Sequence, residues 1–181
     1  RLKIKPEEIK GRFNSEDISI LSWTTTPWTL PGNVALAINP KLEYVAVFTN
    51  RYGPPARYYI LEKNSLERLK SEIPDLDYTQ VPQKIEKEFL LNRYYEPLFD
   101  VSPLESKDSY RIYPADFVTT TDGTGVVHTA VMYGEDDYNL GKKIGLPQHH
   151  TVDEQGKFTK DVKGFEGMPV KAKETEDKIF G

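Results

Sequence analysis

The chain has 181 residues with a net charge of -4, and 38% of its residues are hydrophobic and 29% charged. This length suits one domain with a sizeable core, and no apolar run reaches the roughly 20 residues that cross a bilayer, so we expect a soluble protein. The absence of cysteine excludes disulfides, zinc–thiolate sites and a thiol nucleophile and fits a reducing cytoplasm, while the acidic balance disfavours an autonomous nucleic-acid binder.

The first part of the chain is predicted to be mostly sheet. Runs rich in β-branched and apolar residues are separated by Pro, Gly and Asn, which is typical of short strands joined by turns. The predicted strands are Ile18–Thr26, Val34–Ile38, Tyr44–Thr49 and Arg57–Leu61. A short amphipathic helix follows, which Asn64 or Ser65 caps and Pro74 ends, with Leu66, Leu69 and Ile73 at helical spacing.

The second part mixes strands and helices. Residues 75–108 are irregular, apart from an alternating stretch at 83–91. Strands are predicted at Tyr110–Tyr113 and Val126–Ala130, a helix at Asp136–Ile144 that Gly145 and Pro147 stop, a hairpin turn at Gly156, and a helix at Lys171–Phe180. The pattern predicts a β-rich α+β domain, with a closed or nearly closed β-barrel and a few peripheral helices.

A threonine-rich motif, SWTTTPWTLPGN, occupies residues 22–33. Because side chains alternate along a strand, Thr24 and Thr26 are expected to face one way and Thr25 the other. Together with Thr29 and Asn33 in the following loop, several hydroxyls and an amide can converge at one edge of a sheet. The alternative is an ordinary strand, since threonine favours sheets for steric reasons alone.

A second motif, DGTGVVHTAVMYGEDDY, occupies residues 122–138. It combines a tight turn, a strand that carries His128, and a loop that leads Asp136 and Asp137 into a helix start. Carboxylates at that place suit the positive end of the helix dipole. Asp136 is therefore expected to be a cap, Asp137 either a cap or a functional carboxylate, and His128 either a packing residue or part of a site.

Two further kinds of site are not supported. His149 and His150 lie near Asp153 and Glu154, but adjacent side chains point apart on a strand and no cysteine is available, so we expect no metal site. No G-x-S-x-G signature of a serine hydrolase occurs. A hydrolase built on this chain would use water directly.

Taken together, the two motifs resemble the editing (CP1) insertion of isoleucyl-tRNA synthetases, which are class I aminoacyl-tRNA synthetases. The segments TTTPWTLPGN and GTGVVHTAVMYGEDDY lie about 90 residues apart, and NVALAINP, YYEPLF and GLPQHHTVDEQGKF also resemble this family. The resemblance is weakest over residues 51–83. One departure is Val131, Met132 and Tyr133, where the family often has Pro, then Gly or Ala, then an aromatic residue or His.

The resemblance implies a single β-barrel-containing editing domain over residues 1–181, as a piece of a larger synthetase, and the start at Arg1 agrees with this. The aminoacylation core, which uses ATP and Mg, and the anticodon-binding domain are expected to be absent. The implied activity is cytoplasmic proofreading of Val-tRNA(Ile) after transfer, with pre-transfer proofreading left open. Editing itself would need no cofactor. Its partners would be the 3′ end of aminoacylated tRNA(Ile), the valine moiety and the rest of the synthetase, with no membrane.

The resemblance also implies roles for individual residues. Asp137 would pair with the α-ammonium group of the substrate, and His128 would form a wall of the side-chain pocket. The residues expected to line the terminal adenosine and the ester, and to orient a water, are Thr24, Thr25, Thr26, Thr29 and Asn33. Trp23 would lie beside the terminal base or the pocket wall, with plain core packing as the alternative.

Two other functions stay open. The chain could be the editing domain of a sister valyl- or leucyl-tRNA synthetase, although these usually have an Arg-Pro pair where this chain has Thr26, Pro27 and Trp28. It could also be a non-catalytic insertion that positions tRNA. The altered loop at Val131 is the sequence feature that favours the second alternative.

Overall fold

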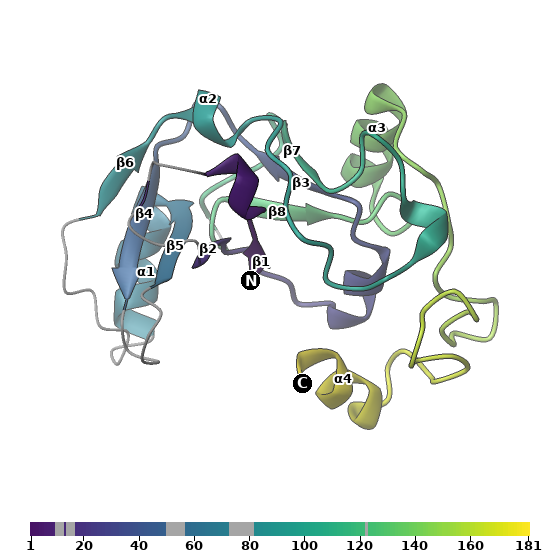
Figure 1. The fold of residues 1–181 in the computed structure, drawn as a ribbon. Helices are drawn as coiled ribbons and strands as arrows, with labels where there is room; N and C mark the ends of the chain where they lie inside the picture. Colours follow the sequence, from purple (N-terminus) through teal and green to yellow (C-terminus); the bar gives the residue numbers. More distant parts are fainter. Residues whose placement is uncertain (10–12, 14–16, 50–56, 73–81, 122) are drawn as a thin grey trace. The chain divides into compact units, whose positions relative to one another are not determined.

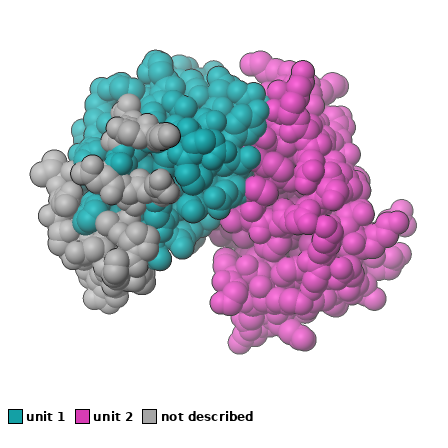
Figure 2. Space-filling model, in the orientation of Figure 1, with its two compact units in different colours: residues 1–23, 36–96, 111–127 teal, residues 24–35, 97–110, 128–181 magenta. Residues whose placement is uncertain are grey.

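The computed structural model describes residues 1–9, 13, 17–49, 57–72, 82–121 and 123–181. The predicted positions Ile73, Pro74 and Asp122 therefore lie outside the described residues. The chain groups into two compact units, coloured separately in Figure 2. Unit 1 contains residues 1–23, 36–96 and 111–127, and unit 2 contains residues 24–35, 97–110 and 128–181.

A five-stranded sheet is the main feature of unit 1 (Figure 1). Its strand order is β1-β2-β5-β4-β6, and the β2–β5 pair is parallel while the other pairs are antiparallel. The strands are β1 (Leu2–Lys3), β2 (Asp17–Ile20), β4 (Tyr44–Thr49), β5 (Arg57–Glu62) and β6 (Gln83–Ile85). Their β-branched and aromatic side chains suit a half-buried pleated surface. The observed bounds of β4 are the predicted ones.

Helix α1 (Lys63–Glu72) packs on this sheet (Figure 1). Leu66 joins a buried cluster with Val45, Val47 and Leu61, and Leu69 packs against it. The helical spacing predicted for the two leucines is therefore confirmed. Burial of these side chains, at about 1.5–3 kcal/mol for each fully buried one, holds the helix to the sheet.

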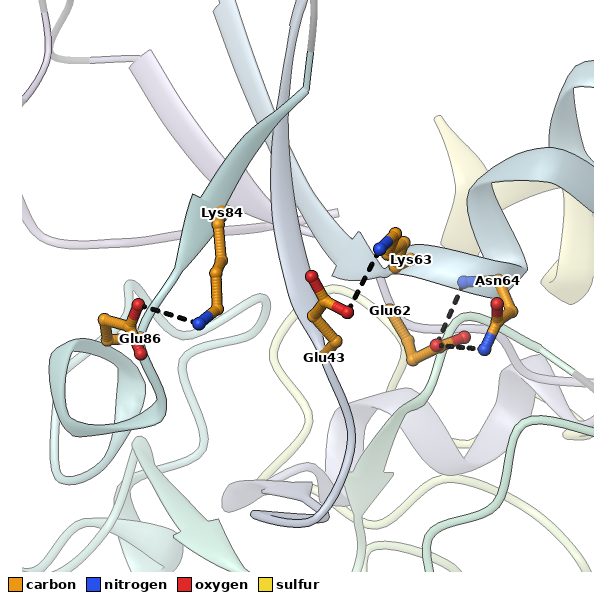
Figure 3. A network of polar contacts seen from close by, with 6 residues as sticks. All are labelled: Glu43, Glu62, Lys63, Asn64, Lys84 and Glu86. Carbon is orange, nitrogen blue, oxygen red and sulfur yellow. Dashed lines mark hydrogen bonds and ion pairs between the residues drawn. The ribbon is translucent and has the colours of Figure 1, made fainter.

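The cap of α1 differs from the prediction. The helix begins at Lys63, and the carboxylate of the preceding Glu62 accepts hydrogen bonds from the backbone N–H groups of Asn64 and Ser65, both at 2.9 Å (Figure 3 draws the first). These donors are otherwise left unpaired at a helix start, and a carboxylate satisfies them well. The predicted cap at Asn64 or Ser65 is therefore wrong.

A second sheet has three strands in the order β7-β3-β8. These are β3 (Ala35–Ile38), β7 (Arg111–Pro114) and β8 (Val126–Thr129). All four residues of the central strand β3 are buried, which its continuous apolar sequence ALAI predicts.

The predicted closed or nearly closed barrel is not found. Among the described residues both sheets are open, and the edge strands β1 and β6 of the larger one have only two and three residues. A barrel requires its edge strands to pair continuously with each other, and edges this short provide too few backbone partners. The mixed α+β class is confirmed.

The other elements are short. The remaining helices are η1 (Pro6–Glu8), η2 (Pro27–Gly32), α2 (Lys87–Leu90), η3 (Ser102–Leu104), α3 (Glu135–Ile144) and α4 (Lys173–Phe180). Helix α3 ends as predicted at Gly145, whose φ of 87° is left-handed. The predicted hairpin at Gly156 is a turn closed by a single bridge between Val152 and Phe158. No helix in the described part of the chain is long and apolar enough to span a membrane.

Candidate functional site

The three consecutive threonines do not lie on a strand. Strand β2 ends at Ile20, six residues earlier than the predicted strand, and residues 21–26 form an irregular segment that leads into η2. The Leu21 N–H still donates to the carbonyl of Ile60 in β5, and beyond Leu21 the chain leaves the sheet. Pro27 then starts a 3-10 helix. The argument from strand alternation therefore fails, although Thr24 and Thr26 do meet.

The hydroxyls of Thr24 and Thr26 lie 3.4 Å apart. The Thr26 N–H also donates to Thr24 Oγ1 at 3.0 Å, which folds the segment into a local turn of the kind that Ser and Thr form. Thr25 and Thr26 are exposed and Thr24 is half-buried. This segment thus presents hydroxyl groups to solvent at the start of η2.

Thr29 and His128 form a buried pair. Thr29 Oγ1 donates to the Thr26 carbonyl at 2.8 Å and lies 3.2 Å from His128 Nε2. Because the single hydroxyl proton is used on the carbonyl, Nε2 must carry the ring proton and donate to Thr29. Nδ1 is then an unprotonated acceptor, and it is buried without a partner among the described residues.

The charge of His128 follows from its surroundings. The side chain is 8% exposed, and burial lowers its pKa to about 4. The ring is therefore neutral at physiological pH. It can form an uncharged wall for an apolar side chain, but it is a poor base for activating Thr29 as a nucleophile.

Asp137 lies in the first turn of α3 and points back toward the strand that precedes the helix. Its Oδ2 accepts a hydrogen bond from the Ala130 N–H at 3.1 Å. Its pKa is raised to about 6, mainly by burial; the Ala130 hydrogen bond lowers the pKa and the nearby charge of Asp136 raises it. A Cβ at Gly134 would lie 3.3 Å from Oδ2, so glycine leaves the approach to this carboxylate open.

Asp136 does not cap α3. The N-cap residue is Gly134, which makes no side-chain cap, and Asp136 is exposed. The prediction of Asp136 as a cap is therefore wrong, because the helix begins one residue earlier than expected and Asp136 falls inside its first turn.

Seven of the eight predicted site residues belong to unit 2. Strand β8 carries His128, and Ala130, the donor to Asp137, follows two residues later, so both candidate groups are positioned by the end of one strand. The Val34 N–H bonds to the Thr129 carbonyl, which holds the segment after η2 beside that strand end. Thr29, His128 and Asp137 are thereby brought to one part of the unit.

Asn33 and Trp23 have different surroundings. The Asn33 side chain is buried and donates to the Ala35 carbonyl at 3.0 Å, so this amide supports the start of β3. Trp23 belongs to unit 1 and is 57% exposed, and a Cβ at Gly123 would lie 3.1 Å from its Cβ. The alternative of core packing for Trp23 is not observed.

Two further side chains named in the sequence analysis are His149 and Tyr133. His149 bonds to Asp161 at 3.0 Å, and no group of three potential metal-binding side chains occurs among the described residues. Tyr133, which the sequence named only as part of the altered loop after Ala130, contacts Trp28 and hydrogen-bonds to the segment at Thr151. No local sequence signal identifies these contacts, because all of them are made to residues distant in the chain.

The arrangement suits recognition of an amine beside a small apolar group. A half-buried carboxylate can pair with an ammonium ion, a neutral imidazole can limit the size of a neighbouring group, and exposed hydroxyls can bond to ester oxygens and water. The Thr29–His128 bond runs from the ring to the hydroxyl oxygen, which is opposite to the direction that nucleophile activation requires.

Comparisons with known proteins agree with the predicted resemblance. The chain is 41% identical over 163 residues to an isoleucine–tRNA ligase of Clostridium kluyveri, and this match covers 90% of the chain and 15% of that protein. It is 39% identical over 176 residues to a probable cytoplasmic isoleucine–tRNA ligase of Dictyostelium discoideum, with 92% and 16% covered. The chain thus spans about a sixth of the length of these relatives. No protein-family model matches it.

Similar solved structures are editing domains. The cytosolic leucyl-tRNA synthetase editing domain of P. falciparum superimposes with a TM-score of 0.62 at 16% identity, covering 96% of this chain and 80% of that one. The GlLeuRS-CP1 structure gives a TM-score of 0.52 at 19% identity, covering 70% and 45%. At these identities the likeness establishes the fold alone.

Proposed function

We propose that this chain, which belongs to the editing-domain region of isoleucyl-tRNA synthetases, hydrolyses the ester of Val-tRNA(Ile) as a proofreading module over residues 1–181. The observation that carries the proposal is the combination of Asp137 and His128 at one strand end. The carboxylate has one hydrogen-bond donor among the described residues and retains capacity for an ammonium group. The neutral imidazole of His128, on the strand that leads to Ala130, can contact an aliphatic side chain.

A second, size-selective site has a clear physical purpose. Valine is smaller than isoleucine by one methylene, and a pocket made for the larger side chain cannot strongly reject the smaller one. Isoleucyl-tRNA synthetases are themselves the standard example of this limit, at about 150-fold discrimination. An editing pocket that admits valine and excludes isoleucine supplies the missing selectivity, and His128 would set its size.

Water is the proposed nucleophile. It would attack the ester carbonyl, the bond from the acyl carbon to the ribose oxygen would break, and that oxygen would leave with a proton as the free hydroxyl of the terminal adenosine. The hydroxyls of Thr24, Thr25 and Thr26 would orient the water and stabilise the developing oxyanion. Thr29 would hold this segment in place, since its buried hydroxyl donates to the Thr26 carbonyl, and Asn33 would support the start of the next strand through the Ala35 carbonyl.

The remaining assignments follow the same proposal. The exposed indole of Trp23 would stack on the terminal base, because a nucleobase offers an aromatic face to such a ring. Partners would be the aminoacylated 3′ end of tRNA(Ile) and the rest of a cytoplasmic synthetase. Editing would use no metal or cofactor, and ATP would serve the aminoacylation core.

The test is time-resolved deacylation of Val-tRNA(Ile), Ile-tRNA(Ile) and Thr-tRNA(Val) by this chain, together with tRNA binding, with Asp137→Ala and the matched control Asp136→Ala alongside. We expect the wild type to hydrolyse Val-tRNA(Ile) faster than Ile-tRNA(Ile). Asp137→Ala should abolish this hydrolysis, and Asp136→Ala should keep it, since Asp136 is exposed. Binding of tRNA without deacylation by any variant would instead support a non-catalytic insertion. Preferential hydrolysis of Thr-tRNA(Val) would support a sister enzyme.

A further inference from the structure

Tyr133 joins three segments of unit 2 that are distant in sequence. Its ring packs edge-on against Trp28 of η2, with centroids 5.3 Å apart at an interplanar angle of 79°, and edge-on against His150 at 6.3 Å. A Cβ at Gly32 would lie only 2.9 Å from Cε2 of Tyr133. Glycine at this position of η2 therefore makes room for the tyrosine ring.

The Tyr133 hydroxyl is fully used in hydrogen bonding. It accepts from the backbone N–H groups of Thr151 and Val152 at 2.8 and 3.0 Å and lies 2.8 Å from Thr151 Oγ1. A phenolic oxygen has two lone pairs and one proton. Because the two N–H groups occupy the lone pairs, the proton is left for Thr151 Oγ1. Thr151 is completely buried, so removal of the phenol oxygen would leave its polar groups without this partner.

The same residue is connected to both halves of the candidate site. The Tyr133 N–H bonds to the Ala130 carbonyl at 2.9 Å, and the N–H of Ala130 bonds to Asp137. Its ring partner Trp28 precedes Thr29, which pairs with His128. The turn at residues 130–133 is held from the other side by Val131, which is buried and so close to α3 that a Cβ at Gly141 would lie 2.5 Å from Val131 Cγ2.

We propose that Tyr133 is a positioning residue, which holds Asp137 and the Thr29–His128 pair in their mutual arrangement by fastening the turn before α3 to η2 and to the segment at Thr151. The consequence for catalysis rests on the proposed editing function. The fastening itself is a structural property of this chain and can be tested without any catalytic activity.

The test compares Tyr133→Phe with Tyr138→Phe in this chain. The first variant removes the three hydroxyl contacts and keeps the ring, while the control removes the hydroxyl of an exposed tyrosine one residue after Asp137. Three quantities are measured: amide exchange at Thr151 and Val152, the titration of the Asp137 carboxyl by NMR, and the kcat and KM of Val-tRNA(Ile) deacylation in the steady state.

For Tyr133→Phe we expect faster exchange at both amides and a midpoint for Asp137 that moves toward the ordinary carboxyl range. The turnover rate should fall about tenfold with KM within about twofold, because a misplaced group slows the chemical step more than it weakens binding. Tyr138→Phe should change none of these. A lower kcat at a nearly unchanged KM, together with a shifted Asp137 titration, distinguishes positioning from a general loss of stability.

Wild-type values for the Asp137 titration and for turnover in folded Tyr133→Phe would overturn the proposal. If the wild-type chain hydrolyses no Val-tRNA, the editing function fails, and the Asp137 titration still decides whether Tyr133 positions that carboxyl. If Tyr133→Phe does not fold, Thr151→Ala removes one of the three contacts, and an unchanged Asp137 titration in that variant contradicts the inference.

Discussion

Each of the two units contains a carboxylate at the start of a helix, and the two have opposite surroundings. Glu62 in unit 1 is 1% exposed, and its two oxygens accept four hydrogen bonds. Two of these come from backbone N–H groups of α1, and two come from the side chains of Asn64 and Ser65 (Figure 3 shows those from Asn64). Asp137 in unit 2 is half-buried and has a single donor among the described residues, the Ala130 N–H.

The difference separates a structural carboxylate from one that is available to a ligand. A buried charge is tolerated where its hydrogen-bonding capacity is filled, as it is for Glu62. Asp137 is partly desolvated but its capacity is not filled, which raises its pKa to about 6. An ammonium group from a substrate would supply the missing partner. Location at a helix start therefore does not separate the two carboxylates, whereas the number of hydrogen-bond donors does, and it makes Asp137 the better candidate for binding a ligand.

The largest expected effect comes from Asp137→Asn. Asn retains an acceptor for the Ala130 N–H but has no charge for the substrate ammonium, so hydrolysis of Val-tRNA(Ile) should fall at least about 100-fold, roughly 3 kcal/mol. The unfolding free energy should not decrease. Single-turnover deacylation and urea denaturation measure the two quantities, and a loss of stability without a loss of rate would show that Asp137 is structural like Glu62.

Glu62→Gln is the converse change. One carboxylate oxygen becomes an NH₂ group that faces two donors, so we expect the unfolding free energy to fall by about 2–3 kcal/mol. The folded variant should retain the wild-type deacylation rate. Urea denaturation followed by circular dichroism checks the first expectation. Unchanged stability would mean that the four hydrogen bonds contribute little over solvation by water.

His128→Ala enlarges the proposed side-chain pocket. We expect hydrolysis of correctly charged Ile-tRNA(Ile) to rise about tenfold, near the effect of one methylene in a hydrophobic pocket, while Val-tRNA(Ile) is still hydrolysed. The ratio of the two deacylation rates is the relevant measurement. Loss of amine recognition in this variant, together with admission of isoleucine by Asp137→Asn, would show that the two roles are reversed.

The pH dependence gives the smallest effect. Because the folded-state pKa of Asp137 is raised from 3.8 to about 6, its contribution to stability is fully present below about pH 4 and is lost as the pH rises through 6. The wild type should therefore be roughly 1 kcal/mol less stable than Asp137→Asn at pH 7 and equal to it at about pH 3, after allowance for partial exposure. Deacylation should increase with pH through about 6 as the carboxylate ionises, and this step should be absent in the Asn variant.

Much of the local structure was predictable because it depends on neighbouring residues. The run of β-branched and apolar residues at Tyr44–Thr49, the glycine at 145 and the spacing of Leu66 and Leu69 each determine an element from residues close in sequence. The threonine segment was predicted wrongly for the opposite reason. Its side chains favour a strand, but a strand also needs backbone partners, and residues 21–26 leave the sheet after Leu21.

The sequence alone determined the mixed α+β class and the kinship with isoleucyl-tRNA synthetases, because hydrophobic period, turn residues and the two motifs can all be read along the chain. It also identified Asp137 and His128 as candidates, and their roles stay predictions. Only the tertiary structure decided which carboxylate is satisfied, which tautomer His128 adopts, and that Tyr133 fastens three segments together. These properties depend on donors and acceptors that come from distant parts of the chain, and no local pattern records where those partners meet.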